Sequence, residues 1–449
     1  MWSLKWCVER RNFRPRLLLS SSKICLVLLL TTLLAARPMR AAPAAPDPVL
    51  EWIAIMNTTV ITGGTSPLLT ARVVALVSAS VFDAVNGIDP RYKPFHVTQD
   101  APPHASQRAA AIQSAYAMLI KLYPAQIGSL TSQRNASIAA ITSSASAQSI
   151  QAGVTWGQAV ADSIFAFRQT DGFTPPPPPF VGVLGIVGSP AAVGVWRPTP
   201  LANLPGAGPQ FASMTPWVLR RPSQFRLPPP LALDSPEYAA DLNETRIMGA
   251  FSGSPRSDDQ SELALFWNGN TPLFWNRIAS QIAAQRSLTL SDNAHLFALL
   301  DVSMADAGIA CWDGKYRYVF WRPITAIRAG ISGADADPTW TPWLDIQTGT
   351  PPFPEYPSGH STVSGAAAFI LTAAFGDNTP FTVTSDVRPG TRAFPSFSEA
   401  VAEIADARVF GGIHFRTACV RGNMLGRAVA DYVSAHAMRE LNGERDEDH

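Results

Sequence analysis

The sequence predicts an all-α fold. Three observations predict it: apolar residues recur at helical spacing through long Ala-rich segments, these segments end near glycine or proline, and alternating strand-like patterns are sparse. The chain has 449 residues, 47% of them hydrophobic, which is enough to bury a sizeable core. This length is compatible with one large helical domain or with two or three smaller ones.

The first 42 residues have the pattern of an export signal. They carry eight Lys and Arg side chains against one Glu, and an apolar run at 24–36 precedes the small residues Ala41 and Ala42. This run of about 13 residues is short of the roughly 20 that span a bilayer, so we expect cleavage and a secreted or periplasmic protein. The alternative is that the segment stays attached as an anchor.

The rest of the chain is mildly acidic. The formal net charge is +1 for the whole sequence and +7 for residues 1–42, which leaves −6 for residues 43–449. This balance gives no reason to expect a nucleic-acid partner. We also expect no membrane-spanning helix after the leader, because no later segment is long and apolar enough.

Two cysteines, Cys311 and Cys419, remain after the leader. The sequence leaves open whether they form a disulfide or stay as two buried free thiols. Neither a Cys-x-x-Cys nor a His-Glu-x-x-His spacing occurs, which argues against a zinc site and against a redox dithiol.

Residues 43–173 are predicted to form an N-terminal helical region. Apolar residues recur at helical spacing over 69–87, 107–122 and 133–168, and glycine or proline stands at the end of each segment or within a few residues of it. The pattern therefore predicts three helices, the last of them long.

Residues 174–233 form a Pro/Gly-rich arm. Prolines cluster at 175–179 and 228–230, and proline cannot continue a helix because it lacks the amide donor. Composition alone would suggest a flexible linker. Aromatic residues such as Phe180 and Trp196 favour instead an ordered arm that packs on the protein surface.

Residues 234–449 are predicted to be helical again and to hold the functional motifs. The predicted helices are 237–251, 260–267, 273–286, one that runs from Ser291 or Asp292 towards Cys311, then 361–375, 397–409 and 420–441. No repeat of fixed period is present in the chain.

The first motif is Lys315, six residues, then Arg322-Pro323. Lysine supplies a compact positive charge, and arginine supplies a planar fork that matches two oxygens of a tetrahedral anion. A separation of seven residues is about two helical turns, so the two cations are predicted to face the same way. By itself the segment would more commonly be a solvated basic face.

The second motif is Ser358-Gly359-His360, directly before a predicted helix. Glycine lets a backbone N–H approach an anion, a helix N-terminus favours negative charge, and the serine hydroxyl can donate a further hydrogen bond. An ordinary turn that caps the helix is the alternative. The Gly-x-Ser-x-Gly elbow of serine hydrolases is absent.

The third motif is Arg408, five residues, then His414. Gly411 and Gly412 lie between them and permit a tight chain path. Taken alone, His414 would by default be explained as a buried histidine of the core.

In this order and spacing, the three motifs resemble the signature of the superfamily of type-2 phosphatidic acid phosphatases and vanadium haloperoxidases. The resemblance covers most of the chain after the leader and is strongest over 290–425. It implies a haloperoxidase-like architecture of two four-helix bundles, with 234–449 as the catalytic helical bundle. The integral-membrane lipid phosphatases of the superfamily are excluded by the expected lack of spanning helices.

The resemblance implies an oxyanion site. Lys315, Arg322 and Arg408 would neutralise the equatorial oxygens of vanadate or phosphate, and Ser358 and the Gly359 N–H would add hydrogen bonds. Such a trigonal-bipyramidal centre needs cations around its equator and groups at its two poles.

The two histidines would stand at the two poles of this centre. His414 would either coordinate vanadium through a ring nitrogen or attack phosphorus as a nucleophile. His360 would act as acid and base on the opposite side, because an imidazole titrates near pH 7. The haloperoxidases also pair the arginine at the Arg408 position with an upstream aspartate. Candidates for this partner are Asp258, Asp259 and Asp301.

Features around the motifs favour vanadate over phosphate. The lead-in from Pro351 to Tyr356 resembles that of fungal chloroperoxidases, and Phe353 and Trp312 stand where those enzymes have aromatic residues on the halide side. Ala418 takes the place of the aspartate that orients the histidine in the phosphatases. The sequence therefore does not identify what holds the second ring nitrogen of His414.

We therefore expect a vanadate-dependent haloperoxidase that uses hydrogen peroxide to oxidise chloride or bromide to hypohalous acid, with a small organic acceptor as a further candidate partner. The alternatives are an exported acid phosphatase with a phosphorylated His414 and a non-catalytic anion-binding protein. The oligomeric state is not predicted.

Overall fold

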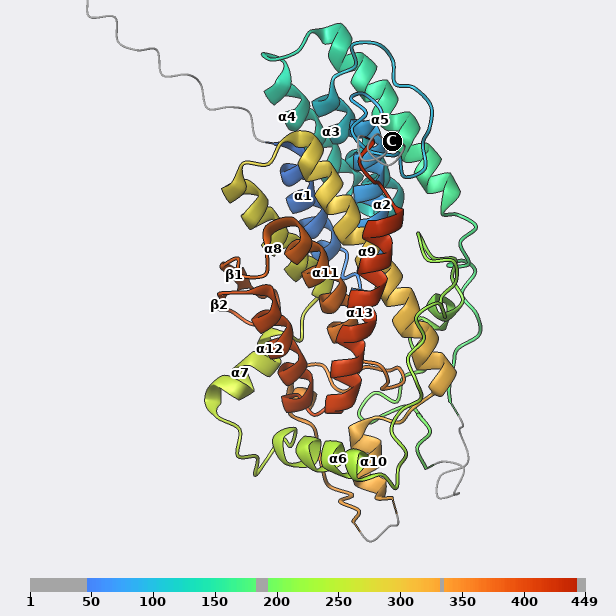
Figure 1. The fold of residues 1–449 in the computed structure, drawn as a ribbon, viewed down its shortest axis with the longest axis vertical. Coiled ribbons are helices and arrows are strands. Elements are labelled where there is room, and N and C mark those ends of the chain that lie inside the picture. The colour runs from blue at the N-terminus through green and yellow to red at the C-terminus, as the bar shows by residue number, and fades with distance from the viewer. Residues whose placement is uncertain (1–46, 183–192, 332–334, 442–449) are drawn as a thin grey trace, which may run out of the picture. The chain divides into compact units, whose positions relative to one another are not determined.

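Helices make up nearly all of the regular structure (Figure 1). The computed structural model describes residues 47–182, 193–331 and 335–441, and all of these belong to one compact unit. Within them lie thirteen α-helices and one two-stranded hairpin, so the all-α prediction is confirmed apart from the hairpin. The predicted export signal, 1–42, lies outside the described residues.

Five helices form the N-terminal part of the molecule. They are α1 (Pro48–Thr62), α2 (Pro67–Asn86), α3 (Gln107–Leu122), α4 (Ile127–Ile141) and α5 (Ala147–Phe167). Helix α1 was not predicted, although Asp47 caps it by accepting from the Val49 N–H at 2.8 Å. The single helix predicted over 133–168 is two helices, because Ser146 caps a new one through the Ser149 N–H.

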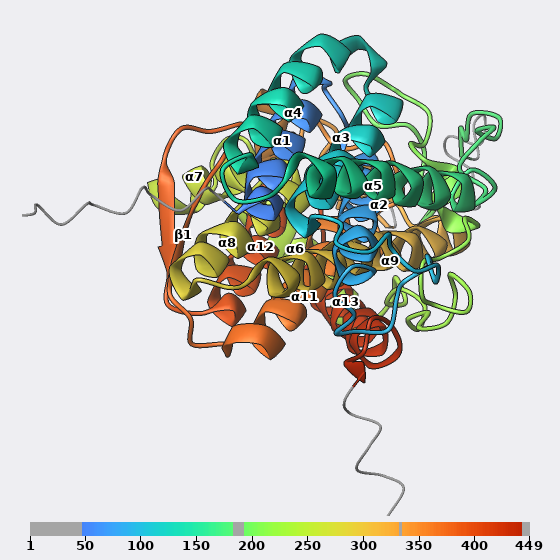
Figure 2. The ribbon, with the colours of Figure 1, turned by 90° about the horizontal axis from the view of Figure 1, so that it is seen from above.

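The longest helix is α9 (Leu290–Tyr318), and it carries the first motif. It begins after Thr289 rather than at Ser291 or Asp292, because the Thr289 side chain accepts from the Asp292 N–H. It also continues two turns beyond Cys311. Helices α2, α13 (Arg416–His436) and α11 (Gly359–Phe375) pack along it (Figures 1 and 2).

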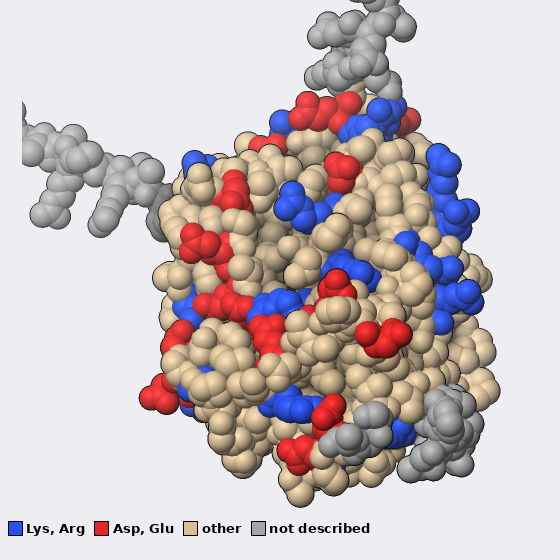
Figure 3. Space-filling view, turned by 60° about the horizontal axis from the view of Figure 1, so that its bottom comes forward, with Lys and Arg blue, Asp and Glu red and all other residues tan. Residues whose placement is uncertain are grey.

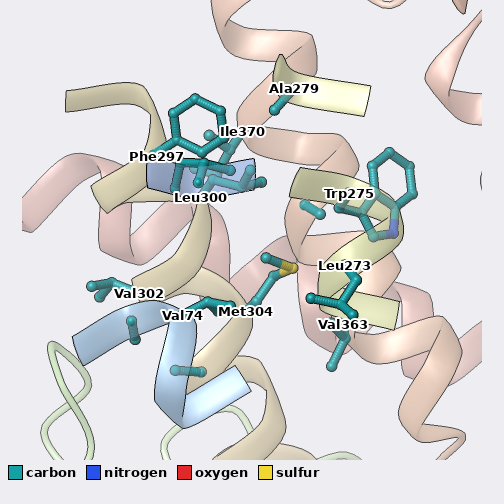
Figure 4. Close-up of a cluster of buried hydrophobic side chains, with 14 of the residues drawn as sticks. Val74, Leu273, Trp275, Ala279, Phe297, Leu300, Val302, Met304, Val363 and Ile370 are labelled. Carbon is teal, nitrogen blue, oxygen red and sulfur yellow. The ribbon is translucent and has the colours of Figure 1, made fainter. Parts of the chain in front are cut away.

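One hydrophobic core joins the N-terminal helices to those that carry the motifs. Figure 4 shows Val74 of α2, Trp275 of α8 (Thr271–Arg286), Met304 of α9 and Val363 of α11 meeting in a single cluster. Each fully buried large apolar side chain stabilises the fold by roughly 1.5–3 kcal/mol. The helices around the motifs are therefore held rigidly by packing on several sides.

Two helices, α2 and α9, meet the length and apolarity criteria for a membrane span. The expectation that no segment after the leader would do so was therefore wrong. In both helices 89% of the most apolar window is buried inside the protein. Their composition is explained by burial on all sides, since a helix at the centre of a bundle has no polar face.

The remaining elements complete the C-terminal part. They are α6 (Pro236–Met248), α7 (Asp258–Phe266), α10 (Pro323–Ala329), α12 (Phe397–Phe410), β1 (Phe381–Thr384) and β2 (Thr391–Phe394). Short 3₁₀ turns lie at Pro124–Gln126, Pro209–Ala212 and Trp343–Ile346. The hairpin pairs Phe381 with Phe394 in antiparallel register and was not predicted. Its strands have four residues each, too few for alternation to be recognised in the sequence.

The described parts of the arm are tied to α9 by carboxylates. Asp306 accepts the successive backbone N–H groups of Trp217, Val218 and Leu219 at 2.6–2.9 Å. About two turns further on, Asp313 receives two N–H groups of the Arg226 guanidinium at 2.6 and 2.7 Å. These bonds give an irregular segment a fixed position without helical hydrogen bonds.

Acidic and basic side chains are interspersed over a mostly uncharged surface on the face shown in Figure 3. Ion pairs at the start of α13 have this mixed character, since Arg416 contacts both Glu244 and Asp406. The two described cysteines, Cys311 and Cys419, are free and buried.

Candidate active site

Lys315 lies in the last turn of α9 and is wholly buried. Its ammonium group donates to three main-chain carbonyls, those of Pro354 (2.9 Å), Glu355 (3.0 Å) and Pro357 (2.5 Å). Burial lowers the pKa of Lys315 to about 7. The carbonyl oxygens thus hold the amine in place without neutralising its charge.

Arg322 does not share a helix with Lys315, so the predicted two-turn spacing was wrong. Helix α9 ends at Tyr318, Val319 turns the chain with a φ of 47°, and Arg322 precedes the first residue of α10. The tertiary fold nevertheless brings both cations to the same place, because each contacts the segment 353–357.

The Arg322 guanidinium is buried and only partly satisfied. Its Nε donates to the Phe353 carbonyl at 2.8 Å, and one terminal nitrogen donates to the Ile413 carbonyl at 2.7 Å and to His414 Nε2 at 3.2 Å. The other terminal nitrogen has no hydrogen-bond partner. Burial lowers the pKa of Arg322 to about 9, which still leaves it charged at neutral pH.

Ser358 and Gly359 stand at the start of α11, as predicted. Ser358 is the N-cap residue, and its hydroxyl accepts from the Ser361 N–H at 3.5 Å. A side chain at Gly359 would begin 3.3 Å from the ring of Trp312, so glycine allows helix α11 to approach α9 closely. The positive end of the α11 dipole therefore points to the same region as the buried cations.

His360 follows in the first turn of α11, and its Nε2 lies 3.2 Å from the Gly269 carbonyl. A carbonyl only accepts, so Nε2 carries the proton and Nδ1 is the basic nitrogen of the neutral ring. Burial and the charge of Arg408 place the pKa of His360 well below its usual value.

Arg408 lies in the last turn of α12, and a tight turn after Phe410 leads to His414. Gly412 has a φ of 74°, and a Cβ there would lie 2.5 Å from the Gly249 carbonyl, so only glycine fits. The buried Arg408 guanidinium donates to the Trp267 carbonyl and to the Asn268 side-chain oxygen, both at 3.3 Å. Its Nε has no partner.

The carboxylate partner expected for Arg408 is not one of the three candidates. Asp259 pairs with Arg392, and Asp301 accepts from Ser78 and Asn276 inside the bundle. Asp258 lies in the first turn of α7. Across the residues that the structure describes, no carboxylate pairs with Arg408, and an amide, Asn268, stands beside it instead.

Glu355 is the site residue that the sequence argument missed. Its Oε1 lies 2.9 Å from His414 Nδ1 and accepts the Phe415 N–H at 3.0 Å, and both side chains are almost completely buried. Burial raises the pKa of Glu355 to about 7. Its position in the lead-in to Ser358 was visible in the sequence, but pairing with a residue 59 positions away was not.

The contacts of His414 define its tautomer. A guanidinium can only donate, so the Nε2 that faces Arg322 is the unprotonated nitrogen, and Nδ1–H is donated to Glu355. Burial and the charges of Arg322 and Lys315 hold the pKa of His414 well below its usual range. His414 is therefore neutral, and its Nε2 lone pair faces the Arg322 guanidinium.

An aromatic wall closes one side of the site. The rings of Trp312 and Phe353 lie 5.0 Å apart, and the Phe353 ring covers Lys315 at 5.0 Å and Arg322 at 4.7 Å. The indole N–H of Trp312 donates to the Ala207 carbonyl at 3.1 Å, so the arm orients this ring.

The arrangement fits a tetrahedral oxyanion. Three buried cations and a helix N-terminus converge, and the Glu355 carboxylate contacts His414 beside them. Within the described residues, Arg322 and Arg408 each have a buried donor without a partner. A buried unpaired donor costs free energy, which an anion would recover. Among the described residues no cluster of three or more His, Cys, Asp or Glu could hold a metal cation.

Comparison with known proteins agrees with this geometry. Residues 295–443 match the family model of the VCPO second helical-bundle domain. Over 255 residues the chain is 29% identical to the vanadium chloroperoxidase of Curvularia inaequalis. The aligned region covers 42% of this chain and 42% of that protein.

Solved structures extend the similarity to the rest of the chain. A bacterial vanadium-dependent iodoperoxidase superposes with a TM-score of 0.77 at 26% identity, over 90% of this chain and 99% of that one. A bacterial vanadium-dependent chloroperoxidase in its apo form shares the fold, with a TM-score of 0.64 at 18% identity, over 82% of this chain and 93% of that one. The expected helical-bundle architecture is thereby confirmed, and the chain is similar in sequence and in fold to vanadium-dependent haloperoxidases.

Proposed function

We propose that this protein is a vanadate-dependent haloperoxidase, which uses hydrogen peroxide to oxidise a halide to hypohalous acid. The observation that carries the proposal is the buried cradle of Lys315, Arg322 and Arg408 beside the unprotonated Nε2 of His414, with guanidinium donors that have no partner among the described residues. The activity named for the chloroperoxidase and iodoperoxidase relatives supports it.

The residues that would hold vanadate are those of the cradle. The positive side chains would face its oxygens, Ser358 and the Gly359 N–H would donate to it, and His414 Nε2 would coordinate it. When bound, pentavalent vanadium is a Lewis acid that activates peroxide towards attack by halide. Arg322 turns one N–H towards His414 in the structure, so this bond is exchanged when Nε2 binds the cofactor.

Lys315 acts mainly through its charge. All three of its donors are engaged by carbonyls, so it contacts an oxygen of the substrate only by exchanging one of those bonds. Its fixed position keeps a positive charge beside the site without a flexible chain having to be ordered on binding.

His360 would hold and transfer the proton of the reaction through Nδ1. Burial and the neighbouring cations lower the pKa of the imidazole and make it a weak base. An anion bound between those cations would offset their charge and raise its basicity. Trp312 and Phe353 would exclude water from the halide side, which makes a halide easier to oxidise.

An acid phosphatase with a phosphorylated His414 is the second candidate, and one observation favours it. The aspartate missing at Ala418 argued against this chemistry, but Glu355 supplies a carboxylate to the same ring nitrogen. Such a pair also suits a nucleophilic histidine.

One assay set separates the two activities. Purified apo-protein is tested with vanadate, hydrogen peroxide and chloride, bromide or iodide, using a small organic acceptor to report halogenation. The same preparation is tested with a phosphate monoester in the absence of vanadate. We expect halogenation that depends on vanadate. Phosphate release without halogenation at saturating vanadate would contradict the proposal and establish the phosphatase.

We also propose that residues 1–42 direct export. The basic stretch, the short apolar run and the small residues that follow support this assignment. N-terminal sequencing of the protein recovered from periplasm and medium should find a mature chain that starts near residue 43. Recovery of the intact N-terminus in the membrane fraction would indicate an anchor instead.

A further inference from the structure

We propose that Glu355 is a positioning residue that selects vanadate over phosphate, by holding His414 as the tautomer and in the orientation that presents Nε2 to the cofactor. This inference rests on the proposed function. It adds a residue for which the signature motifs have no place, because Glu355 lies in the lead-in to the second motif.

Glu355 forms hydrogen bonds with both the ring of His414 and the backbone of the next residue. Its Oε1 receives His414 Nδ1–H at 2.9 Å and the Phe415 N–H at 3.0 Å. Glu355 is itself held at both ends of its peptide unit, because its N–H donates to the Phe320 carbonyl at 2.9 Å and its carbonyl accepts from Lys315 at 3.0 Å. The carboxylate therefore has little freedom to move away from the ring.

The ring cannot turn over without losing contacts on both sides. A 180° flip would turn one ring C–H towards the Arg322 guanidinium and another towards the carboxylate, so both hydrogen bonds would be lost. A carboxylate on the far nitrogen also raises the basicity of the ligating nitrogen. Glu355 thus sets both the direction and the strength of the lone pair.

Ala418 makes room for this arrangement. Glu355, Ala418, Asp241 and Thr417 line one small cavity, with room for about one water. A second carboxylate at position 418 would face Glu355 across this buried space at a high electrostatic cost. The alanine and the glutamate are therefore complementary, and the carboxylate comes from a different segment than in the phosphatase signature.

The proposal separates two anions of the same shape. Vanadate needs a coordinate bond from Nε2, whereas phosphate is held only by charge and hydrogen bonds. Loss of the Glu355 charge should weaken vanadate binding about 10- to 100-fold, as is typical for the partner of a ligating histidine. Phosphate binding should stay unchanged or tighten, because a negative charge near the anion is removed.

The experiment is calorimetric titration of the apo-protein with orthovanadate and, separately, with inorganic phosphate. Glu355→Gln keeps an acceptor for both N–H groups but loses the charge, so a vanadate loss near 10-fold is expected; Glu355→Ala should approach 100-fold. The matched control is Asp241→Asn, which removes a carboxylate from the same cavity without contact to His414 and should leave both affinities unchanged. Equal weakening of vanadate and phosphate, or unchanged vanadate binding in both Glu355 variants, would overturn the proposal.

A second measurement decides the point without vanadate. Long-range proton–nitrogen NMR of ¹⁵N-histidine-labelled apo-protein, assigned with His414→Gln, should show the Nδ1–H tautomer in the wild type and in Glu355→Gln. Glu355→Ala should show a mixture, and an unchanged tautomer there would refute the positioning role. Wild-type protein that binds vanadate no more tightly than phosphate would count against the haloperoxidase, while the NMR result still decides the role of Glu355.

Discussion

Two buried polar clusters on helix α9 differ in how completely their groups are satisfied. Asp306 accepts three backbone N–H groups of the arm, and both oxygens of its carboxylate are hydrogen-bonded. Nine residues later, Lys315 borders a cluster in which Arg322 and Arg408 retain unpartnered donors. The first cluster is complete within the chain and serves structure, whereas the second is complete only with an anion.

This contrast predicts that changes in the two clusters have separable effects. Variants of the cradle should lose binding or activity with little loss of stability. Variants at the other carboxylates of α9 should change stability and leave the chemistry largely intact.

The largest effect is expected for His414→Ala, which removes the one lone pair aimed into the cradle. Activity should fall to background whether the protein is a haloperoxidase or a phosphatase. The measurement is the halogenation and phosphatase assay pair on protein whose helical circular dichroism matches the wild type. A variant that keeps substantial activity would remove His414 from the chemistry, and a non-catalytic anion-binding protein would have no activity to lose.

Arg408→Gln comes next. Loss of a preorganised donor should lower activity about 100- to 1,000-fold and weaken anion binding. The apo-protein should be as stable as the wild type or more so, because a buried cation without a carboxylate partner is removed. Thermal unfolding with and without vanadate tests both statements. A markedly lower melting temperature of the apo-variant would mean that Arg408 serves structure.

Asp306→Asn tests the structural role of the cluster between α9 and the arm. The neutral amide loses the charge-assisted bonds to the arm, so stability should fall by about 2–4 kcal/mol. Denaturant unfolding measures this loss, and limited proteolysis should cut the arm earlier. The vanadate affinity should change little. A loss of affinity as large as that of Arg408→Gln would show that the two clusters are coupled.

The smallest effect concerns Asp301, whose pKa is raised by burial to about 7. Between about pH 4 and 7 the folded state holds a proton that the unfolded state has lost, so stability falls as pH rises through this range and levels off above it. Asp301→Asn should remove this slope and be more stable at pH 8 by about 1–2 kcal/mol. Denaturant unfolding at pH 5 and pH 8 measures the difference, and identical slopes in both proteins would contradict it.

Most helices and every cradle residue could be predicted from the sequence, because their signals are local. Caps, glycines and apolar periodicity mark the helices, and each motif lies within nine residues. Helix α1 and the hairpin were missed, and one predicted helix is two. In each case the feature that sets the element spans too few residues to form a recognisable pattern: a single capping side chain or a strand of four residues.

The sequence by itself therefore determined three motifs of basic and histidine side chains and the oxyanion chemistry that they suit, but not Glu355. Only the tertiary structure decided how they are held. It placed Lys315 and Arg322 on different elements, set Asn268 rather than an aspartate beside Arg408, and brought Glu355 to His414. These contacts join residues far apart in the chain, and no local pattern encodes a partner that only folding brings within 3 Å.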